Sequence, residues 1–477
     1  MLFHTHDFFA LLLVTLITFR IARSGRQWIL LISSLMFYTY AGVATALLFF
    51  AIILFNYFCY LSISQGQGLR WLSLAITVDL ANLFMFKYFG FLLSIFAGAG
   101  LDYPTAQGWV SDNVILPVGI SFYTFQLIAL LVDTYRGKSP RVKDLKEFFV
   151  FITFFGQLIA GPIMHGREFL PQLRHLNGAR AEQIAGGVVV FLIGLVKKVL
   201  IADWLLAPIV ETLFARSLEW DTPTSWFLGI LFGFQIYFDF SGYCDMAIGL
   251  GRFFGLELRV NFSTPYISRT PSEFWNRWNI TLSQWFGAYV YIPLGGSRIS
   301  LPKTAVNIFA TMLVSGLWHG AGYTFVVWGV IHGVYLSAFH VLRWISPGIA
   351  RSLSASRISF ASIIGWAFTT VVCTIGWVYF RADSTHQANA IVLQMLGGGG
   401  GSVSGPIGRY ALVSGLLISA HFIEYQFWRN FPPMLEHAMR CWSRFPGPCQ
   451  ALIAFLVLFG VIAMTKKTQG AFIYFQF

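Results

Sequence analysis

Two histidines lie in one of the most apolar stretches of the chain, "WHGAGYTFVVWGVIHG" at residues 318–333. A buried imidazole needs a hydrogen-bond partner or a chemical task. If this stretch were one continuous α-helix, the intervening residues at about 1.5 Å each would place His319 and His332 roughly 20 Å apart, on different faces. A single small site could then use only one of them.

The glycines around His319 make it the stronger candidate of the two. A lone histidine in an apolar helix is more often a core residue than a functional one, but Gly316, Gly320 and Gly322 remove side-chain bulk here. Such an opening would let backbone or a substrate come close. A neutral imidazole can take a proton from an attacking hydroxyl or carry an acyl group. We therefore predict a functional His319 and a structural His332 that is hydrogen-bonded within the helix bundle.

Two carboxylates interrupt another apolar helix, "QIYFDFSGYCDMAIGLG" at residues 235–251. Carboxylates inside a membrane are rare and are usually functional or paired. Asp239 and Asp245 point about 120° away from each other on a helix, so they form no ready acid/base pair. They either orient Arg or Tyr partners in the bundle or line a polar passage.

A polar, tryptophan-rich block, "NFSTPYISRTPSEFWNRWNITLSQWFGAYVYIPLGG", occupies residues 261–296. Within it, "TPSEFW" predicts a helix start with Thr270 or Ser272 as the N-cap. Glu273 and Arg277 then lie on one face of that helix.

This block has two interpretations that the sequence leaves open. It is either an interfacial helix with Trp275, Trp278 and Trp285 at the level of the lipid headgroups, or part of a polar cavity lined by Arg277 and Asn279.

The composition identifies a membrane protein. Of 477 residues, 56% are hydrophobic and only 11% are charged, whereas soluble domains carry about a quarter charged residues. No polar stretch is long enough for a separate soluble domain, so we expect one integral membrane domain over residues 1–477. The five cysteines show no CxxC spacing, which argues against a zinc site or a disulfide framework, and we expect no metal centre. Basic cytoplasmic loops explain the net charge of +12 better than nucleic-acid binding does.

The apolar pattern predicts an all-α, polytopic protein with about eleven transmembrane helices. They lie near residues 7–22, 28–42, 44–63, 71–96, 114–135, 183–213, 224–250, 322–342, 358–380, 409–428 and 448–464. The first of them has neither a basic region before it nor a cleavage site after it, so we expect a retained span. Three stretches that are too short or too polar to cross the membrane predict re-entrant or interfacial helices, at 148–164, 261–303 and 304–318. The glycine run at 397–401 predicts a flexible outer loop.

The charged loops orient the first spans. Arg20, Arg23 and Arg26 cluster after Phe19, near the end of the first span. The segment "RGKSPRVKDLK" at 136–146 is strongly basic, whereas residues 97–113 hold two Asp and no Lys or Arg. Basic loops face the cytoplasm. We therefore place the N-terminus on the outer side.

Several long motifs resemble those of the membrane-bound O-acyltransferases, in particular the bacterial branch of alginate O-acetylases. They occur in order along most of the chain: "LPVGISFYTFQ" at 116–126, "GPI" at 161–163, "QIYFDFSGYCDMAIGLGRFFG" at 235–255, "NFSTPYISRTPSEFWNRW" at 261–278, "YIPLGG" at 291–296, "GLWHGAGYTFVVWGVIHG" at 316–333 and the terminal "FIYFQF".

The resemblance implies helices around a central funnel or tunnel, with a catalytic histidine near the middle of the membrane at the position of His319. It also implies transfer of an acetyl group from cytoplasmic acetyl-CoA toward an exported, alginate- or cellulose-like polysaccharide, and hence a place in a bacterial inner membrane. Asn279 would donate a hydrogen bond to the oxyanion formed from the thioester. Our candidates for the lining of the tunnel are Arg277, Trp278, Asp239, Tyr243, Trp318 and Gly320.

The acyl donor and the polymer each imply a further feature. The phosphates of coenzyme A predict cationic side chains at the cytoplasmic mouth, with Lys138, Lys143, Lys197 and Lys198 as candidates; no cofactor is expected to stay bound. Short external loops leave little surface for gripping a polymer. As the resemblance also implies, we expect a separate periplasmic or membrane-anchored acetyltransferase to complete the transfer.

The sequence departs from the polysaccharide branch at two places. That branch usually has His after "RW", where this chain has Asn279 like the lipid- and protein-acylating branches, and it often has an Arg-Asp pair where this chain has "FGAY" at 286–289. An acyltransferase acting on lipid or protein is therefore one alternative. A transporter is another, although the lack of an internal repeat and the histidine motif favour the enzyme.

Overall fold

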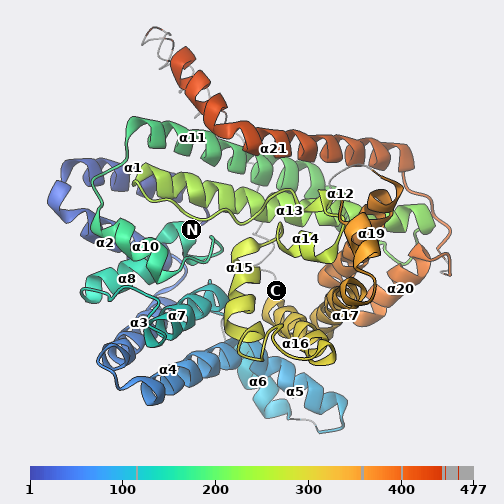
Figure 1. Cartoon of the computed structure of the whole chain (residues 1–477), viewed down its shortest axis with the longest axis horizontal. Helices are drawn as coiled ribbons and strands as arrows, with labels where there is room; N and C mark the ends of the chain where they lie inside the picture. Colours follow the sequence, from blue (N-terminus) through green and yellow to red (C-terminus); the bar gives the residue numbers. More distant parts are fainter. Residues whose placement is uncertain are drawn as a thin grey trace. The chain divides into compact units, whose positions relative to one another are not determined.

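The computed structural model describes residues 1–101, 103–113, 116–355, 359–398 and 401–442, together with residues 446, 449 and 460; for 111–113 and 429–442 it gives the backbone alone. Within these ranges every regular element is a helix, and one isolated bridge pairs Trp220 with Val403 (Figure 1). The predicted all-α class is confirmed. The contacts divide the chain into two compact units; the single integral membrane domain stays a prediction.

The first unit comprises residues 1–195 and 243–259. Its helices are α1 (His6–Ile21), α2 (Arg26–Thr39), α3 (Val43–Ser64), α4 (Gly68–Leu83), α5 (Phe89–Gly98), α6 (Pro104–Asn113), α7 (Ile120–Tyr135), α8 (Leu145–Thr153), α9 (Phe155–Leu158), α10 (Gly166–Arg174) and α11 (Ala181–Leu195). A π-helical segment, Phe84–Tyr88, joins α4 to α5, and a 3-10 turn, Arg23–Gly25, joins α1 to α2.

The second unit comprises residues 196–242 and 260–477. Its helices are α12 (Ala207–Ala215), α14 (Pro271–Trp275), α15 (Ile280–Phe286), α16 (Leu301–His319), α17 (Tyr323–Ile345), α18 (Pro347–Leu353), α19 (Phe360–Arg381), α20 (Thr385–Met395) and α21 (Ile407–Trp442). It also holds π-helical segments at Val196–Leu206 and Gly287–Tyr291 and a 3-10 turn at Pro265–Ile267. The long helix α13 (Thr222–Phe253) contributes its first part to this unit and its last part to the first unit.

Five helical segments in the described part of the chain are long and apolar enough to cross a membrane: Val43–Ser64, Gly68–Gly98, Ala181–Ala215, Tyr323–Ile345 and Phe360–Arg381. Each coincides with a predicted span, and the protein is a multi-pass membrane protein. Helices α1 and α2 pass the same test only as a pair, and they are bent by 116° at the break between them. The predicted total of eleven is not confirmed, and the predicted span at 448–464 lies outside the described residues apart from residues 449 and 460.

The stretches that looked too polar or too short to cross the membrane differ from one another. Residues 148–164 and 261–300 contain only short helices, such as α9 and α14, which agrees with the prediction. The third stretch belongs to α16, a continuous 19-residue helix. The glycine run follows α20 and begins at Gly397, whose φ of +80° suits glycine; residues 399–400 lie outside the description.

The break between α16 and α17 decides how the histidine motif folds. Helix α16 ends at His319, and Gly320 and Gly322 adopt extended backbone before α17 begins. The two helices then pack closely side by side in antiparallel directions (Figure 1). Glycines allow this approach: a Cβ on Gly329 would come within 2.8 Å of the Met312 carbonyl oxygen.

Candidate active site

His319 lies at the C-terminal end of α16 and is almost fully buried. Three aromatic rings surround its imidazole. The ring centroids of Trp318, Trp328 and Phe380 lie 5.0, 4.9 and 5.2 Å from that of His319. The imidazole is therefore held in place by packing, and its environment excludes bulk water.

His332 contacts the same indole as His319. Its ring centroid is 4.6 Å from that of Trp328 and 5.2 Å from that of Trp275. The sequence argument placed the two histidines far apart on the condition that one helix was continuous. That condition is wrong, because the chain turns back at Gly320–Gly322 and brings both imidazoles to one ring.

Six aromatic side chains enclose the two histidines, and we call them the aromatic cluster: Phe274, Trp275, Trp278, Trp328, Trp377 and Phe380. Its rings follow one another at centroid distances of 4.7 Å (Trp278–Trp377), 5.6 Å (Trp377–Phe380), 5.6 Å (Trp275–Trp328) and 5.8 Å (Phe274–Trp278). They come from α14, the turn after it, α17 and α19. All six are buried. This burial favours the cavity interpretation of the 261–296 block over the headgroup interpretation, which requires Trp275 and Trp278 to face lipid.

Several polar atoms inside the cluster have no hydrogen-bond partner among the described residues: Nε1 of Trp275, Trp328 and Trp377, and Nε2 of His332. Buried donors and acceptors are nearly always satisfied in proteins, and each exception calls for an explanation. The Nε2 atom of His332 thus lacks the bond within the bundle that the sequence predicted. A polar group that enters the cluster would satisfy these atoms.

Asn279, also in the second unit, combines an unusual backbone conformation with a buried, unsatisfied side chain. It precedes α15 with φ 42° and ψ 56°, a left-handed conformation that asparagine tolerates better than most residues. The side chain of Asn261 fixes this turn, because its Oδ1 accepts bonds from the backbone N–H of Thr281 at 3.0 Å and from its hydroxyl at 2.9 Å. Asn279 is buried, and its Nδ2 has no hydrogen-bond partner in the described ranges. A strained backbone with an unsatisfied buried donor is typical of a functional position.

The helix start in the same block forms as predicted. Thr270 is the N-cap of α14 and accepts a bond from the backbone N–H of Glu273 at 3.2 Å. Arg277 pairs with Glu273 at 3.1 Å and donates to the Ser263 carbonyl oxygen at 3.0 Å. Arg277 therefore holds the loop together through these bonds.

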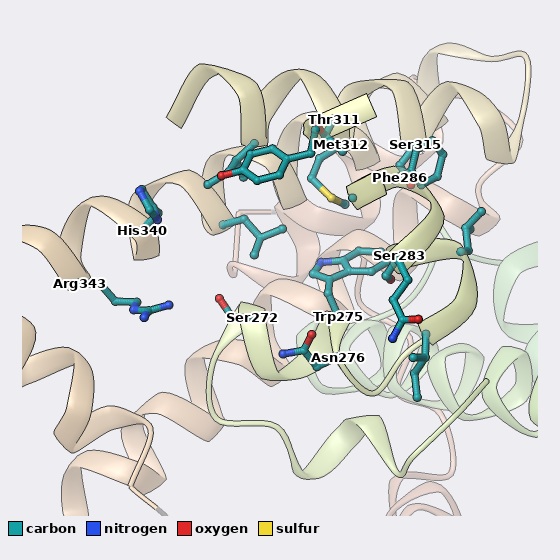
Figure 2. A pocket seen from close by; sticks show the side chains of 17 residues that line it. Ser272, Trp275, Asn276, Ser283, Phe286, Thr311, Met312, Ser315, His340 and Arg343 are labelled. Carbon is teal, nitrogen blue, oxygen red and sulfur yellow. The ribbon is translucent and has the colours of Figure 1, made fainter. Parts of the chain in front are cut away.

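A cavity of about 360 Å³ lies between α14, α15, α16 and α17, and Trp275 of the aromatic cluster lines it (Figure 2). His340 and Arg343 stand on one side of it, and Ser315 and Phe286 on the other. Ser315 precedes His319 by one turn on the same face of α16. Neither His319 nor Asn279 is among the described residues that line the cavity. Sequence reasoning missed Ser315, His340 and Arg343. The signal for Ser315 is its position one turn before His319 on α16, and the signal for His340 and Arg343 is the polar side chains spaced along α17.

Trp318 and Gly320 flank His319, and neither lines the cavity between α14, α15, α16 and α17. Trp318 packs its indole on the imidazole. A side chain on Gly320 would collide with the ring of Phe325, and one on Gly316 would collide with backbone of α17. The glycines thus let other parts of the protein pack close to His319. Of the two possibilities given by the sequence, close approach of backbone or of a substrate, the structure shows the first at Gly316.

Asp239, Lys197 and Lys198 form buried ion pairs. The Lys198 ammonium lies 2.6 Å from a carboxylate oxygen of Asp239 and 2.8 Å from one of Asp203, and Lys197 pairs with Glu424. The prediction that these lysines stand at an open mouth for coenzyme A is therefore wrong, since both are buried and bound to carboxylates. Asp239 matches the alternative of a carboxylate paired in the bundle, with a lysine in place of the expected Arg or Tyr.

The remaining candidates belong to the first unit. Tyr243 is buried and stacks on Phe3 with ring centroids 4.4 Å apart. Lys138 and Lys143 are exposed in the loop between α7 and α8. Their loop is basic and exposed, and the cytoplasmic position predicted for it stays a prediction.

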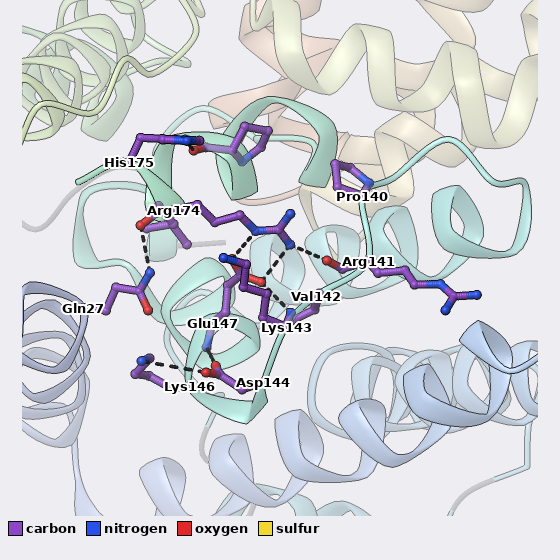
Figure 3. A network of polar contacts seen from close by, with 12 residues as sticks. Gln27, Pro140, Arg141, Val142, Lys143, Asp144, Lys146, Glu147, Arg174 and His175 are labelled. Carbon is purple, nitrogen blue, oxygen red and sulfur yellow. Dashed lines mark hydrogen bonds and ion pairs between the residues drawn. The ribbon is translucent and has the colours of Figure 1, made fainter. Parts of the chain in front are cut away.

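A polar network fixes this basic loop (Figure 3). Glu147 accepts bonds from Arg174 at 2.7 and 3.0 Å and from the backbone N–H of Lys143 at 2.6 Å. The Glu147 carboxylate thereby raises the pKa of the Arg174 guanidinium. The side chain of Arg141 extends away from the network and leaves its charge at the surface. The described part of the chain contains no group of three or more His, Cys, Asp or Glu that could hold a metal ion.

The helical fold and the buried histidine agree with a family match. Residues 28–382 match the family model of the membrane-bound O-acyltransferases. The chain belongs to this family and is an acyltransferase, as its motifs suggested.

Three individual relatives of the chain are named for acyl transfer to a polymer. The chain is 34% identical over 480 residues to a probable alginate O-acetylase of Pseudomonas putida, covering 95% of this chain and 94% of that one. It is 35% identical over 402 residues to a peptidoglycan O-acetyltransferase of Helicobacter pylori, covering 78% and 74%. A teichoic acid D-alanyltransferase of Streptococcus thermophilus is 28% identical over 248 residues, covering 49% and 58%.

Proposed function

We propose that this protein transfers an acetyl group from cytoplasmic acetyl-CoA for the O-acetylation of an exported polysaccharide, such as an alginate- or cellulose-like exopolysaccharide. The observation that carries the proposal is a buried His319 inside the aromatic cluster, next to a cavity with a basic side. The names of the relatives support it, because two of them are named for the O-acetylation of alginate or peptidoglycan and the third for D-alanyl transfer to teichoic acid.

His319 is the catalytic residue of the proposed reaction. Its neutral imidazole takes the proton from the attacking hydroxyl of the acceptor while the new O–C bond forms between that hydroxyl oxygen and the thioester carbonyl carbon of acetyl-CoA. The C–S bond then breaks, and the imidazolium returns the proton to the departing thiolate. The products are an acetyl ester and coenzyme A with a free thiol, so no oxidant or metal takes part in the balance.

Asn279 supplies the second role. Its buried Nδ2–H group, which has no partner among the described residues, would donate a hydrogen bond to the oxyanion that forms when the carbonyl is attacked. Removing one such donor commonly raises the barrier by about 3 kcal/mol. An amide cannot act as a base, so His319 alone moves the proton.

The cavity would hold the acyl donor. Its volume of about 360 Å³ falls in the range of small-molecule sites, and it leads along α16 toward Ser315, one turn from His319. Arg343 is exposed and forms no ion pair with a carboxylate in the described part of the chain. We assign Arg343, with His340, to the phosphates of coenzyme A. They take the place of Lys197 and Lys198, which are buried in ion pairs, whereas the roles predicted for Lys138 and Lys143 stay predictions.

The proposed reaction implies where the protein lies in the cell and which other protein it works with. A donor made in the cytoplasm and an acceptor outside it place the protein in the bacterial inner membrane. We propose that the acetyl group passes to a separate periplasmic or membrane-anchored acetyltransferase, which completes the transfer to the polymer.

One experiment separates the enzyme from a transporter. Purified protein in lipid nanodiscs is incubated with acetyl-CoA and an oligosaccharide acceptor, with and without the partner, and thiol release and acetyl esters are measured. Histidine-dependent thiol release supports the enzyme. Flux of sugar across proteoliposomes without any thiol release would support the transporter.

Asn279 favours one second candidate, an acyltransferase that acts on a lipid or a protein. Mass analysis of acetylated products in cells with and without the gene decides between the acceptors. Esters that disappear from lipid or protein fractions, while the polymer keeps its acetyl groups, would replace the polysaccharide proposal.

A further inference from the structure

A cavity of about 710 Å³ lies within the first unit, among residues that the acyl-transfer chemistry does not use. The end of α1, the start of α2, the connection from Leu176 to Ala179 and the first turns of α11 form its walls. One side of this cavity is cationic and the other is apolar.

Three arginines make the cationic side: Arg20, Arg23 and Arg26. None of the lining residues is acidic. Arg20 and Arg23 are exposed, and neither forms an ion pair with a carboxylate among the described residues. Three guanidinium groups gathered without a counter-charge attract an anion.

Arg26 is held in place by the protein backbone. Its Nη1 donates to the Leu176 carbonyl oxygen at 2.8 Å, its Nε donates to the Phe19 carbonyl oxygen at 3.3 Å, and its guanidinium lies 5.1 Å from the centre of the Phe19 ring. Gly178 makes room for it, because a Cβ at this residue would come within 2.9 Å of Nη2. The fold therefore holds one of the three guanidinium groups, that of Arg26, at a fixed place in the wall of the cavity.

The apolar side lies on helices associated with the membrane. Ile184 and Val188 belong to the first turns of the membrane-crossing segment Ala181–Ala215, and Leu16 belongs to α1. Val188 is 43% exposed. A soluble phosphate would gain nothing from this wall, whereas a molecule with an anionic head and an acyl chain would use both sides.

We propose that this cavity binds an anionic phospholipid, with its phosphate at Arg20, Arg23 and Arg26 and an acyl chain along Leu16, Ile184 and Val188. Basic pockets at the ends of membrane-crossing helices have the chemistry to select such headgroups. The predicted cytoplasmic position of these arginines places the lipid in the inner leaflet. This inference does not rest on the proposed function.

Native mass spectrometry of the purified full-length protein tests the site, with phosphatidylglycerol and phosphatidylcholine of the same acyl chains as probes. We expect the wild type to retain phosphatidylglycerol more strongly. The double variant R20Q/R23Q should bind it roughly 30-fold more weakly, from two lost charge contacts near a membrane surface, with phosphatidylcholine unaffected. Each single variant should give roughly a fivefold loss, which keeps the test valid if the double variant does not fold.

A charge-matched control removes two exposed arginines of the second unit, in R351Q/R409Q, and should leave phosphatidylglycerol binding unchanged. Equal retention of the two lipids, or no change in R20Q, R23Q and the double variant, would overturn the proposal. So would displacement of the lipid by equal concentrations of glycerol phosphate or coenzyme A, because that result would identify a site for soluble anions.

Discussion

The imidazoles of His319 and His332 lie against the same indole ring, with centroids 4.9 and 4.6 Å from that of Trp328. One histidine ends α16 and the other lies in the third turn of α17. Because both touch one ring, a change at either residue alters the packing of the other. The roles of the two histidines are therefore separated only by measuring catalytic activity and stability on the same variant.

His319→Ala should abolish acyl transfer in a folded protein. Loss of a general base costs a factor of roughly 100 to 10,000 in kcat, whereas the lost packing affects one end of α16. Coenzyme A release is measured beside size-exclusion behaviour, with the exposed His386→Ala as the control. Wild-type turnover in the folded variant would remove His319 from the mechanism.

His332→Ala should cause a partial loss of activity that follows the loss of stability. The side chain is buried between Trp328, Trp275 and Phe274, so its removal leaves a cavity in the aromatic cluster. Thermal unfolding and activity are measured on the same sample. Full inactivity at normal stability would show that His332 takes part in the chemistry.

Arg343→Gln should raise the KM for acetyl-CoA roughly tenfold and leave kcat nearly unchanged, because a charge-assisted bond to a phosphate contributes to binding and not to the reacting carbonyl. Arg351→Gln, on an exposed arginine of α18, is the matched control. A loss confined to kcat would contradict the assignment of the cavity to the donor.

Lys198→Met should destabilise the protein by about 3–5 kcal/mol, because it leaves the buried carboxylates of Asp239 and Asp203 without their cation. Adding Asp239→Asn to the same variant should recover part of the loss. Thermal unfolding in detergent measures both. Arg216→Gln, which breaks an exposed pair with Glu219, should have little effect, and an equal effect there would show that burial does not govern the cost.

Cysteine labelling checks the orientation. A cysteine placed in residues 103–110 should react with an impermeant reagent in intact cells, and one placed at Lys138 or Lys143 should react only after the membrane is opened. The reverse pattern would invert the topology derived from the basic loops, and with it the leaflet proposed for the phospholipid.

The sequence by itself determined the class of the protein and its local structure. Composition and apolar runs suffice for a multi-pass helical protein, because the membrane requires long apolar helices whatever they pack against. The N-cap at Thr270 and the pair of Glu273 with Arg277 were also predictable, since both depend on residues three or four positions apart.

Tertiary structure alone decided which polar groups meet. Lys198 pairs with Asp239 on another helix, and Arg343 reaches the same cavity as Ser315 only because α16 and α17 pack antiparallel after the break at Gly320–Gly322. Helical periodicity in the sequence shows which face of a helix a residue occupies. It does not show which other helix packs against that face. The contact of both His319 and His332 with the ring of Trp328 follows from that turn, which residues 320–322 make possible because they lie outside both helices.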